Sequence, residues 1–171
     1  MTKKKAIFLD RDGVINKEVN YLHKIEDFEF TTNCLAALQT LQSKGYLLFV
    51  VTNQAGIGRG YYTENDFEQL QSWMVAQLNE HGISITDTRY CPHHPTSGIG
   101  MYKIDCECRK PEIGMLTSLI EKYDIDISQS AFVGDKMSDM NAGLAANIGT
   151  LVLVKSGHKL PHKIPDFVTY V

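Results

Sequence analysis

Acidic and polar side chains in this 171-residue chain stand directly after short apolar runs. Asp10 and Asp12 follow one run, Thr52 follows a second, and Asp135 follows a third. If these runs are neighbouring strands, the carboxylates converge and repel one another, and a divalent cation with oxygen ligands usually resolves such repulsion. Mg²⁺ fits these ligands best. Because Lys110 adds a positive charge, the groups together could hold a phosphoryl group.

Two carboxylates that lie two residues apart can divide the work of phosphoryl transfer. An ionised carboxylate can attack phosphorus and form an aspartyl phosphate, which water then hydrolyses. The other carboxyl group can protonate the leaving oxygen and later take a proton from water. Asp and Gly are common turn residues, so a strand followed by Asp-Xaa-Asp-Gly is weak evidence alone. The prediction therefore depends on the residues at the other strand ends.

A cluster of cysteine and histidine residues predicts a metal site of a different kind. Three thiolates and one imidazole form a closed tetrahedral set that suits structural Zn²⁺, supplied here by Cys91, His93, Cys106 and Cys108. His94 is the competing ligand, and free buried thiols are the alternative to a metal site. A bound zinc ion would order the long loop 90–109 and hold Arg109 and Lys110 beside the phosphate site. Cys34 stands apart and is expected to be a small buried apolar residue.

The elements that must position these residues alternate along the chain. Short, nearly continuous apolar runs at residues 6–9, 46–51, 131–133 and 150–154 are typical of strands covered on both faces of a parallel sheet. Helices are predicted from Cys34 to a stop at Gly45, from a cap at Thr63 to Gly82, from Pro111, and over residues 138–146. This alternation predicts an open α/β sheet flanked by helices, which binds ligands at the carboxyl ends of its strands.

Composition excludes several other classes of protein. The formal net charge is -3 and the pI is about 6.0, so no global basic field is present for nucleic acid. The longest apolar run, at residues 46–51, is far short of the roughly 20 residues of a membrane-spanning helix. The apolar residues after Lys5 are too few for a signal peptide. We therefore expect a single domain over residues 1–171 that is cytoplasmic and monomeric, with neither nucleic acid nor membrane as a partner.

Four motifs together resemble those of the haloacid dehalogenase superfamily of phosphatases, at residues 8–14, 51–53, 109–111 and 134–139. The resemblance implies a Rossmann-like sheet without a separate cap domain. It implies Asp10 as the nucleophile and Asp12 as the general acid and base, with Thr52 and Lys110 holding the phosphoryl oxygens. Mg²⁺ would be bound by Asp10, the backbone carbonyl of Asp12, and Asp135. Asp139 could orient Lys110 or a metal-bound water, or could simply face the dipole of a helix N-terminus.

Within that superfamily the zinc loop is similar to a subgroup of heptose bisphosphate phosphatases and histidinol-phosphate phosphatases, and the segments 10–16, 52–60 and 134–136 favour the heptose enzymes. A sugar bisphosphate carries a second phosphate, which Arg109 and Lys136 could bind. The role of Arg59 stays open between substrate and solvent. The residues predicted to contact the substrate are Arg11, Glu18, Val19, Asn20, Tyr21, Asn53, Gln54, Ala55, Arg109 and Lys136. Ala55 can offer only its backbone amide, where the family often has Ser.

Two other functions remain open from the sequence. The first is histidinol-phosphate phosphatase, which belongs to the same reaction class. The second is a zinc-loop binding module for protein or nucleic acid, in which the carboxylates are only structural. The acidic balance and the absence of a basic and aromatic face near the cluster argue against the module.

Overall fold

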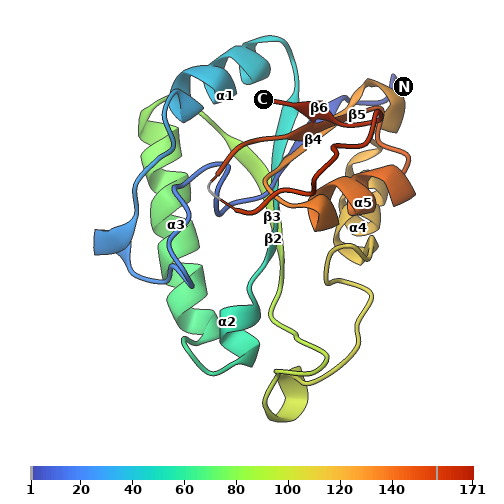
Figure 1. Ribbon diagram of the computed structural model, residues 1–171. Coiled ribbons are helices and arrows are strands. Elements are labelled where there is room, and N and C mark those ends of the chain that lie inside the picture. The colour runs from blue at the N-terminus through green and yellow to red at the C-terminus, as the bar shows by residue number, and fades with distance from the viewer. Residues whose placement is uncertain (1, 157) are drawn as a thin grey trace.

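A parallel sheet of six strands runs through the middle of the protein. The computed structural model describes residues 2–156 and 158–171. Its strands lie in the order β3-β2-β1-β4-β5-β6, and every neighbouring pair is parallel (Figure 1). The strands are β1 (Ala6–Leu9), β2 (Leu47–Asn53), β3 (Ile85–Cys91), β4 (Ala131–Gly134), β5 (Thr150–Leu153) and β6 (Thr169–Tyr170).

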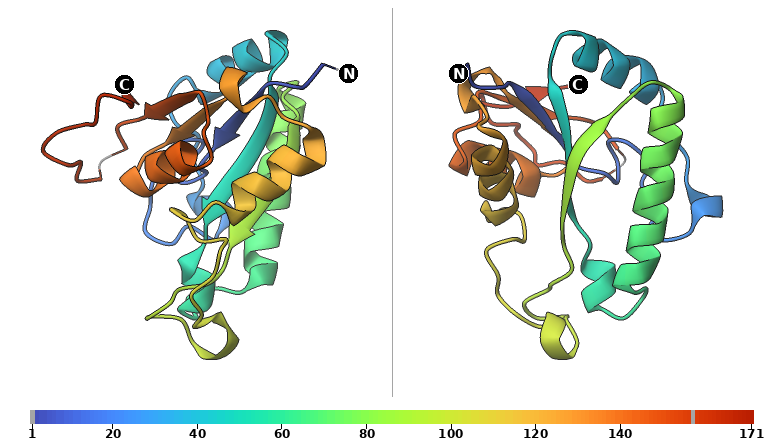
Figure 2. Two further views of the ribbon diagram at one scale, coloured as in Figure 1. Left: turned by 90° about the vertical axis from the view of Figure 1, so that its right-hand side faces the viewer. Right: turned by 180° about the vertical axis from the view of Figure 1, so that it is seen from behind.

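Helices cover both faces of this sheet. On one face lie α1 (Cys34–Ser43) and α3 (Glu64–Glu80), and on the other lie α4 (Gly114–Tyr123) and α5 (Met137–Ala145), as Figure 2 shows. Shorter pieces are α2 (Ala55–Gly58) and the 3₁₀ turns η1 (Ile25–Asp27), η2 (Gly100–Tyr102) and η3 (Ile127–Gln129). Over the described ranges, no helix combines the length and the apolar character needed to cross a bilayer.

The central strands bury both of their faces, as their continuous apolar runs predict. In β1, Ile7 and Leu9 pack with Leu38 of α1 and Met74 of α3, whereas Phe8 packs on the opposite face. That opposite face is filled by the helices α4 and α5, with Met115, Leu116, Leu119 and Met140. Because side chains alternate along a strand, one short run supplies two separate cores.

The sequence predictions for the strands and helices were right for the central elements and wrong at three places. The predicted sheet lacked β3 and β6. The helix expected from Pro111 begins three residues later, at Gly114, because residues 109–113 form a turn in which the amide of Glu112 donates to the carbonyl of Arg109 at 2.8 Å. The cap at Thr63 is present, with reciprocal hydrogen bonds to Asp66. Cys34 is buried, as expected.

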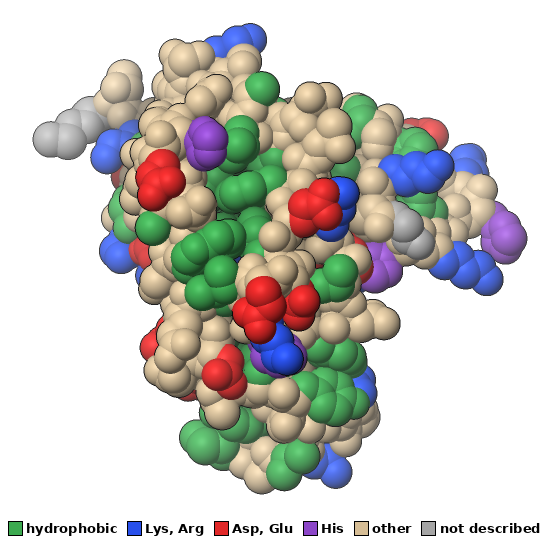
Figure 3. Space-filling view, turned by 90° about the vertical axis from the view of Figure 1, so that its left-hand side faces the viewer, with side chains coloured by type: hydrophobic (Ala, Val, Ile, Leu, Met, Phe, Trp, Pro, Cys, Tyr) green, Lys and Arg blue, Asp and Glu red, His purple; other side chains and the backbone are tan. Residues whose placement is uncertain are grey.

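The segment between β1 and α1 contains only η1 and forms no cap domain among the described residues. Aromatic rings attach it to α3, since Phe28 lies 4.9 Å from Phe30 and 5.2 Å from Trp73 between ring centroids. Hydrophobic side chains gather in the middle of the face that carries η1 and α3, with acidic and basic groups around them (Figure 3).

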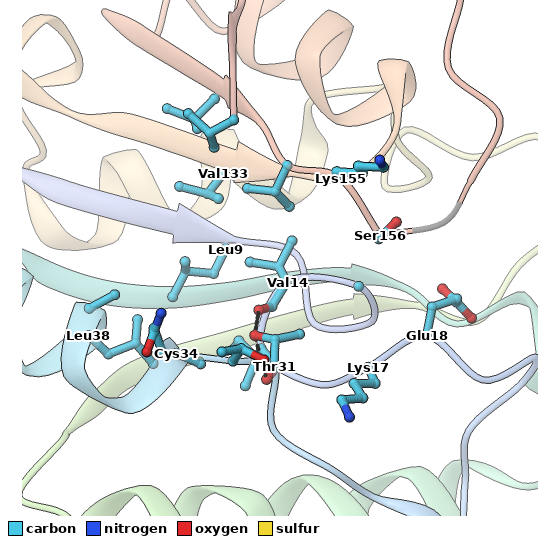
Figure 4. A pocket seen from close by; sticks show the side chains of 18 of the residues that line it. Leu9, Val14, Lys17, Glu18, Thr31, Cys34, Leu38, Val133, Lys155 and Ser156 are labelled. Atoms are coloured by element: carbon cyan, nitrogen blue, oxygen red, sulfur yellow. Dashed lines mark hydrogen bonds between the residues drawn. The ribbon is translucent and has the colours of Figure 1, made fainter.

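One cavity beside this segment is mostly apolar. It has a volume of about 740 Å³ and lies beside α1, β1 and β4, and Leu9, Val14, Leu38 and Val133 are among its lining residues (Figure 4). The hydroxyl of Thr31 donates to the carbonyl of Val14 at 2.6 Å in its wall. A lining of this composition offers few groups for chemistry, so the smaller polar cavity described next is the candidate site.

Candidate active site

The carboxyl ends of β1, β2 and β4 meet at one edge of the sheet. Leu9 of β1 pairs with Val50 and with Val133, and the amide of Asp10 donates to the carbonyl of Val133 at 3.0 Å. Asp10 and Asp135 therefore leave adjacent strands at the same level. A polar cavity of about 330 Å³ opens at this edge, and Asp10 and Lys110 both line it.

Lys110 is the buried cation of this cavity. Its ammonium group lies 2.7 Å from Asp139 and 3.2 Å from Asp10, and it donates to the carbonyl of Val51 at 2.7 Å. Burial alone would lower the pKa of Lys110, but the carboxylates of Asp10 and Asp139 raise it above its usual value. The residue is 3% exposed and thus presents a fixed positive charge at the end of β1.

Three buried carboxylates surround that single ammonium group. Oxygens of Asp10, Asp135 and Asp139 all lie within 4.8 Å of one another. Burial raises the pKa of Asp10 well above its usual value, and although Lys110 opposes this, the neighbouring carboxylates add to it. Burial likewise raises the pKa of Asp135. Three negative charges against one positive leave a charge of about -2, which one divalent cation balances.

The two oxygens of Asp135 have different surroundings. One of its oxygens, Oδ2, accepts from Ser156 at 2.8 Å and faces His158 at 3.2 Å, whereas Oδ1 is buried without a hydrogen-bond partner among the described residues. A buried carboxylate oxygen normally has a partner, so this atom points to a ligand. Hard oxygen donors of this kind fit Mg²⁺.

The carboxylate of Asp12 is held apart from the cluster of three. It accepts from Arg11 at 3.1 Å, from Asn16 at 3.0 Å and from Gln54 at 3.0 Å. Although burial acts to raise its pKa, the charge of Arg11 and these hydrogen bonds bring the pKa of Asp12 below its usual value. Its side chain thus lines the cavity while its orientation is determined by neighbouring polar groups.

Polar residues at the end of β2 have distinct partners. Thr52 is fully buried, and its hydroxyl accepts from Gln54 at 2.8 Å. Asn53 makes a reciprocal pair with the backbone of Lys110, in which its amide donates at 3.1 Å and its oxygen accepts at 3.0 Å. Asn53 therefore fastens the turn that carries Lys110 to β2.

The cavity brings together most residues that the sequence predicted for the site. Those that line it are Asp10, Asp12, Glu18, Asn20, Tyr21, Asn53, Gln54, Ala55, Arg109, Lys110 and Lys136. Thr52 and Asp135 lie buried beside it.

Two of the predicted substrate contacts lie elsewhere. Arg11 is 1% exposed, and its guanidinium donates to the carbonyl of Leu22 and packs over Phe67, because the chain turns it inward after β1. Val19 is exposed to solvent outside the lining.

Several lining residues were not predicted as part of the site. They are Leu22, Gly56, Tyr62, Ser138 and His158, and Arg59 and Asp139, whose roles the sequence left open, also line the cavity. His158 faces Glu18 at 3.1 Å and Asp135 at 3.2 Å. Ser156 and His158 follow the predicted run 150–154, so examining the end of this strand as well would have found them.

The four predicted zinc ligands converge where the end of β3 meets the loop that leads to α4. The sulfur of Cys108 lies 2.9 Å from that of Cys91 and 3.2 Å from that of Cys106. Nδ1 of His93 lies 3.4 Å from the sulfur of Cys108. All four cysteines are free, and three thiols with one imidazole at such distances fit a tetrahedral metal ion. Nδ1 of His94 instead accepts from the amide of Ser97 at 3.0 Å.

Comparison with known proteins agrees with this arrangement. The family described as polynucleotide kinase 3 phosphatase matches residues 5–150, from β1 to the start of β5. The parallel sheet, the carboxylates at its edge and this match define the class: the chain belongs to a phosphatase family of the haloacid dehalogenase superfamily.

Individual relatives indicate which family within this superfamily the chain resembles. A D-glycero-alpha-D-manno-heptose-1,7-bisphosphate 7-phosphatase of Photorhabdus laumondii is 51% identical over 91% of this chain and 85% of its own length. The corresponding beta-named enzyme of Pasteurella multocida is 51% identical over 98% of this chain and 91% of its own. A similar solved structure is the crystal structure of the D,D-heptose 1,7-bisphosphate phosphatase of B. bronchiseptica, complexed with magnesium and phosphate. It matches with a TM-score of 0.80 and 26% identity, and the match covers 98% of this chain and 92% of that one.

Within the superfamily, this chain belongs to the family of D-glycero-D-manno-heptose-1,7-bisphosphate 7-phosphatases. The heptose resemblance inferred from the sequence is therefore confirmed at the level of the family. These names support it over the histidinol-phosphate alternative.

Proposed function

We propose that this chain is a Mg²⁺-dependent phosphatase that removes the 7-phosphate of D-glycero-D-manno-heptose 1,7-bisphosphate, with residues 1–171 acting as one phosphatase domain. The observation that carries the proposal is the group of buried carboxylates, Asp10, Asp135 and Asp139, around the ammonium of Lys110 at the end of a polar cavity. The substrate in this proposal is the one that the names of the relatives give.

Asp10 is the proposed nucleophile. Its ionised carboxylate attacks phosphorus, a bond forms between a carboxylate oxygen and phosphorus, and the bond from phosphorus to the sugar oxygen breaks. Asp12 gives its proton to that leaving oxygen. In the second half, Asp12 takes a proton from water as the water oxygen attacks phosphorus, which releases phosphate and restores Asp10.

Lys110 and Thr52 are proposed to hold the phosphoryl oxygens during both steps. Phosphoryl transfer depends mainly on positioning and charge neutralisation, and the ammonium of Lys110 is already fixed 3.2 Å from Asp10. Mg²⁺, held by Asp10, Asp135 and the backbone carbonyl of Asp12, would supply further positive charge against the phosphoryl oxygens.

The rest of the substrate is proposed to extend along the cavity. Arg109 and Lys136 are the cations proposed to bind the phosphate that stays on the sugar, because guanidinium and ammonium groups recognise phosphate dianions. Glu18, Asn20 and Tyr21 line the same cavity and are the proposed partners of the sugar hydroxyls.

A structural zinc ion is proposed for Cys91, His93, Cys106 and Cys108. A closed set of four protein ligands leaves no open position for catalysis. Cys108 directly precedes Arg109 and Lys110, so the ion would hold these two residues where the cavity needs them. We also propose that the chain acts as a cytoplasmic monomer, without nucleic acid or membrane as a partner, on a small-molecule substrate.

Phosphate release by the purified protein tests the reaction. We expect turnover of the heptose bisphosphate with Mg²⁺, and at least about 100-fold less with histidinol phosphate. Both anomers should be tried because the two relatives carry different anomer names. Asp10→Asn should abolish turnover while the protein stays folded, as a cooperative thermal transition would show, because Lys110 keeps Asp139 at 2.7 Å. Asp124→Asn, which removes an exposed carboxylate, is the matched control. Full activity of Asp10→Asn would overturn the nucleophile assignment.

A further inference from the structure

Gln54 is a buried amide whose polar atoms all have protein partners. Its side chain is 2% exposed and lies between the end of β2 and α2. Nε2 donates to Oδ2 of Asp12 at 3.0 Å and to the hydroxyl of Thr52 at 2.8 Å. Oε1 accepts from the hydroxyl of Tyr62. Since both amide protons and the oxygen are engaged, the amide is placed to hold Asp12 rather than a substrate.

Asp12 and Tyr62 together fit one orientation of this amide. When Asp12 is ionised its carboxylate can only accept, so it needs the nitrogen of Gln54 rather than its oxygen. The phenol of Tyr62 completes this orientation by donating to the oxygen. Burial raises the pKa of the phenol above its usual value, which keeps its proton in place near neutral pH. Turning the amide over would place its oxygen against the carboxylate of Asp12, and two buried acceptors that face each other are costly.

Contacts on two sides hold the ring of Tyr62 in position. A Cβ atom at Gly56 would lie 2.2 Å from Cε1 of this ring, so the absence of a side chain there lets the ring approach α2. The ring of His23 stacks on it at 5.0 Å between centroids with an interplanar angle of 7°. Ile57 and Phe67 enclose it in a small apolar cluster. A ring seated this closely restricts where the hydroxyl can point.

We propose that Tyr62 and Gln54 form a positioning pair that orients the carboxyl group of Asp12 for proton transfer. This inference rests on the proposed phosphatase reaction, in which Asp12 gives a proton to the leaving oxygen and takes one from water. Neither side chain of the pair touches the reacting phosphorus. The pair acts by keeping Asp12 in one orientation, with Asn16 and Arg11 as the other donors.

The dependence of the rate on the leaving group gives a test. A poor leaving group such as a sugar alkoxide needs a proton from the general acid, whereas an aryloxide such as p-nitrophenolate leaves without one. Tyr62→Phe keeps the ring and removes only the hydroxyl. Because Asp12 also acts as the base in the second half-reaction, which all esters share, the comparison uses kcat/KM, which reports phosphoryl transfer from the ester. We expect kcat/KM to fall by about tenfold or more with alkyl phosphate esters and by less than about threefold with p-nitrophenyl phosphate. KM should stay within about twofold, because no substrate contact is removed.

Two further variants complete the experiment. Gln54→Glu replaces the donor to Asp12 by a carboxylate and should show a larger loss of the same kind. Tyr90→Phe is the matched control, because Tyr90 packs on Phe67 beside the same apolar cluster but does not line the cavity. It should leave kcat and its leaving-group dependence unchanged.

The outcomes separate the inference from the function on which it rests. An equal fall in kcat/KM for alkyl and aryl esters in Tyr62→Phe, or a rise in KM with kcat unchanged, would overturn the positioning pair while the wild-type enzyme remains a phosphatase. A wild-type protein that releases no phosphate from any ester would overturn the proposed function instead. Thermal unfolding of each variant, measured alongside, identifies a loss that comes from misfolding. If Tyr62→Phe misfolds, Gln54→Glu is judged by the same comparison of esters.

Discussion

Removing the carboxylate of Asp139 should both destabilise the protein and inactivate it. Asp139 is almost fully buried, and its two oxygens have separate tasks. Oδ1 lies 2.7 Å from the ammonium of Lys110, and Oδ2 accepts from the amides of Asp135 and Lys136, each at 3.2 Å. In Asp139→Ala, Lys110 keeps only Asp10 as a charged partner, and the two amides at the start of α5 lose their acceptor.

The expected loss follows from these contacts. Removing one partner of a buried ion pair costs about 3–5 kcal/mol because the other charge stays buried. Each lost amide hydrogen bond adds about 1 kcal/mol. Relief of the repulsion between Asp139 and the carboxylates of Asp10 and Asp135 offsets part of this. With Mg²⁺ bound the site is close to neutral, so the offset is small, and we expect a net loss of about 4–6 kcal/mol in unfolding free energy.

Urea unfolding in saturating Mg²⁺ near neutral pH measures this loss. Asp124→Asn is the control, since its pair with Lys3 spans 3.9 Å between largely exposed side chains and should contribute nothing measurable. The double variant Asp139→Ala/Lys110→Met removes both charges of the pair and should be more stable than Asp139→Ala. A loss below about 1 kcal/mol in Asp139→Ala, or additive losses in the double variant, would refute the reasoning.

Three further predictions concern other parts of the chain. Cys108→Ser should reduce bound zinc from about one ion per chain to none, as measured by metal analysis. The same variant should strongly reduce phosphate release. Unchanged metal content would contradict the zinc site. Asp87→Asn should lower the unfolding free energy by about 1 kcal/mol near neutral pH, because Asp87 accepts from Lys122 at 2.8 Å and from Tyr123 at 2.9 Å. Although burial acts to raise it, these bonds lower the pKa of Asp87. The difference in unfolding free energy between Asp87→Asn and wild type should therefore persist above about pH 4 and vanish as the pH falls through that lowered pKa. A difference that grows in acid would contradict this sign. Burial raises the pKa of Cys34 to about 11, so its thiol should react with a disulfide reagent near neutral pH only after unfolding, and rapid labelling of the native protein would contradict its burial.

The accuracy of the strand predictions follows how each strand is buried. The runs 6–9 and 150–154 match β1 and β5 to within one residue, because β1 is apolar and buried throughout and β5 is apolar after Thr150. β3 was missed because it is the edge strand and carries Thr86, Asp87, Thr88 and Arg89, which are only partly buried. A search for continuous apolar runs cannot find a strand of this kind. β6 has two residues and offers no pattern at all.

The candidate site likewise contains residues that the sequence could predict and contacts that it could not. Asp10, Thr52 and Asp135 could be predicted because strand ends of a parallel sheet meet at one edge, whatever the loops do. The contact between Gln54 and Tyr62 could not, since α2 and the turn after it determine whether two residues eight positions apart meet. The inward turn of Arg11 depends equally on Phe67 and Leu22, which lie far from it in sequence.

Asp139 shows why the sequence left two roles open for one residue. Its position three residues after Lys136 predicts a carboxylate that faces the amides of a helix start, and its place in a phosphatase motif predicts a partner for Lys110. The two are compatible because α5 begins directly after β4, so the helix N-terminus and the catalytic edge of the sheet are the same place. A Cβ atom at Gly134 would lie 2.3 Å from the Cβ of Asp139, so the last residue of β4 must be small for the helix to start this close. The carboxylate can then reach the amides with one oxygen and the ammonium of Lys110 with the other.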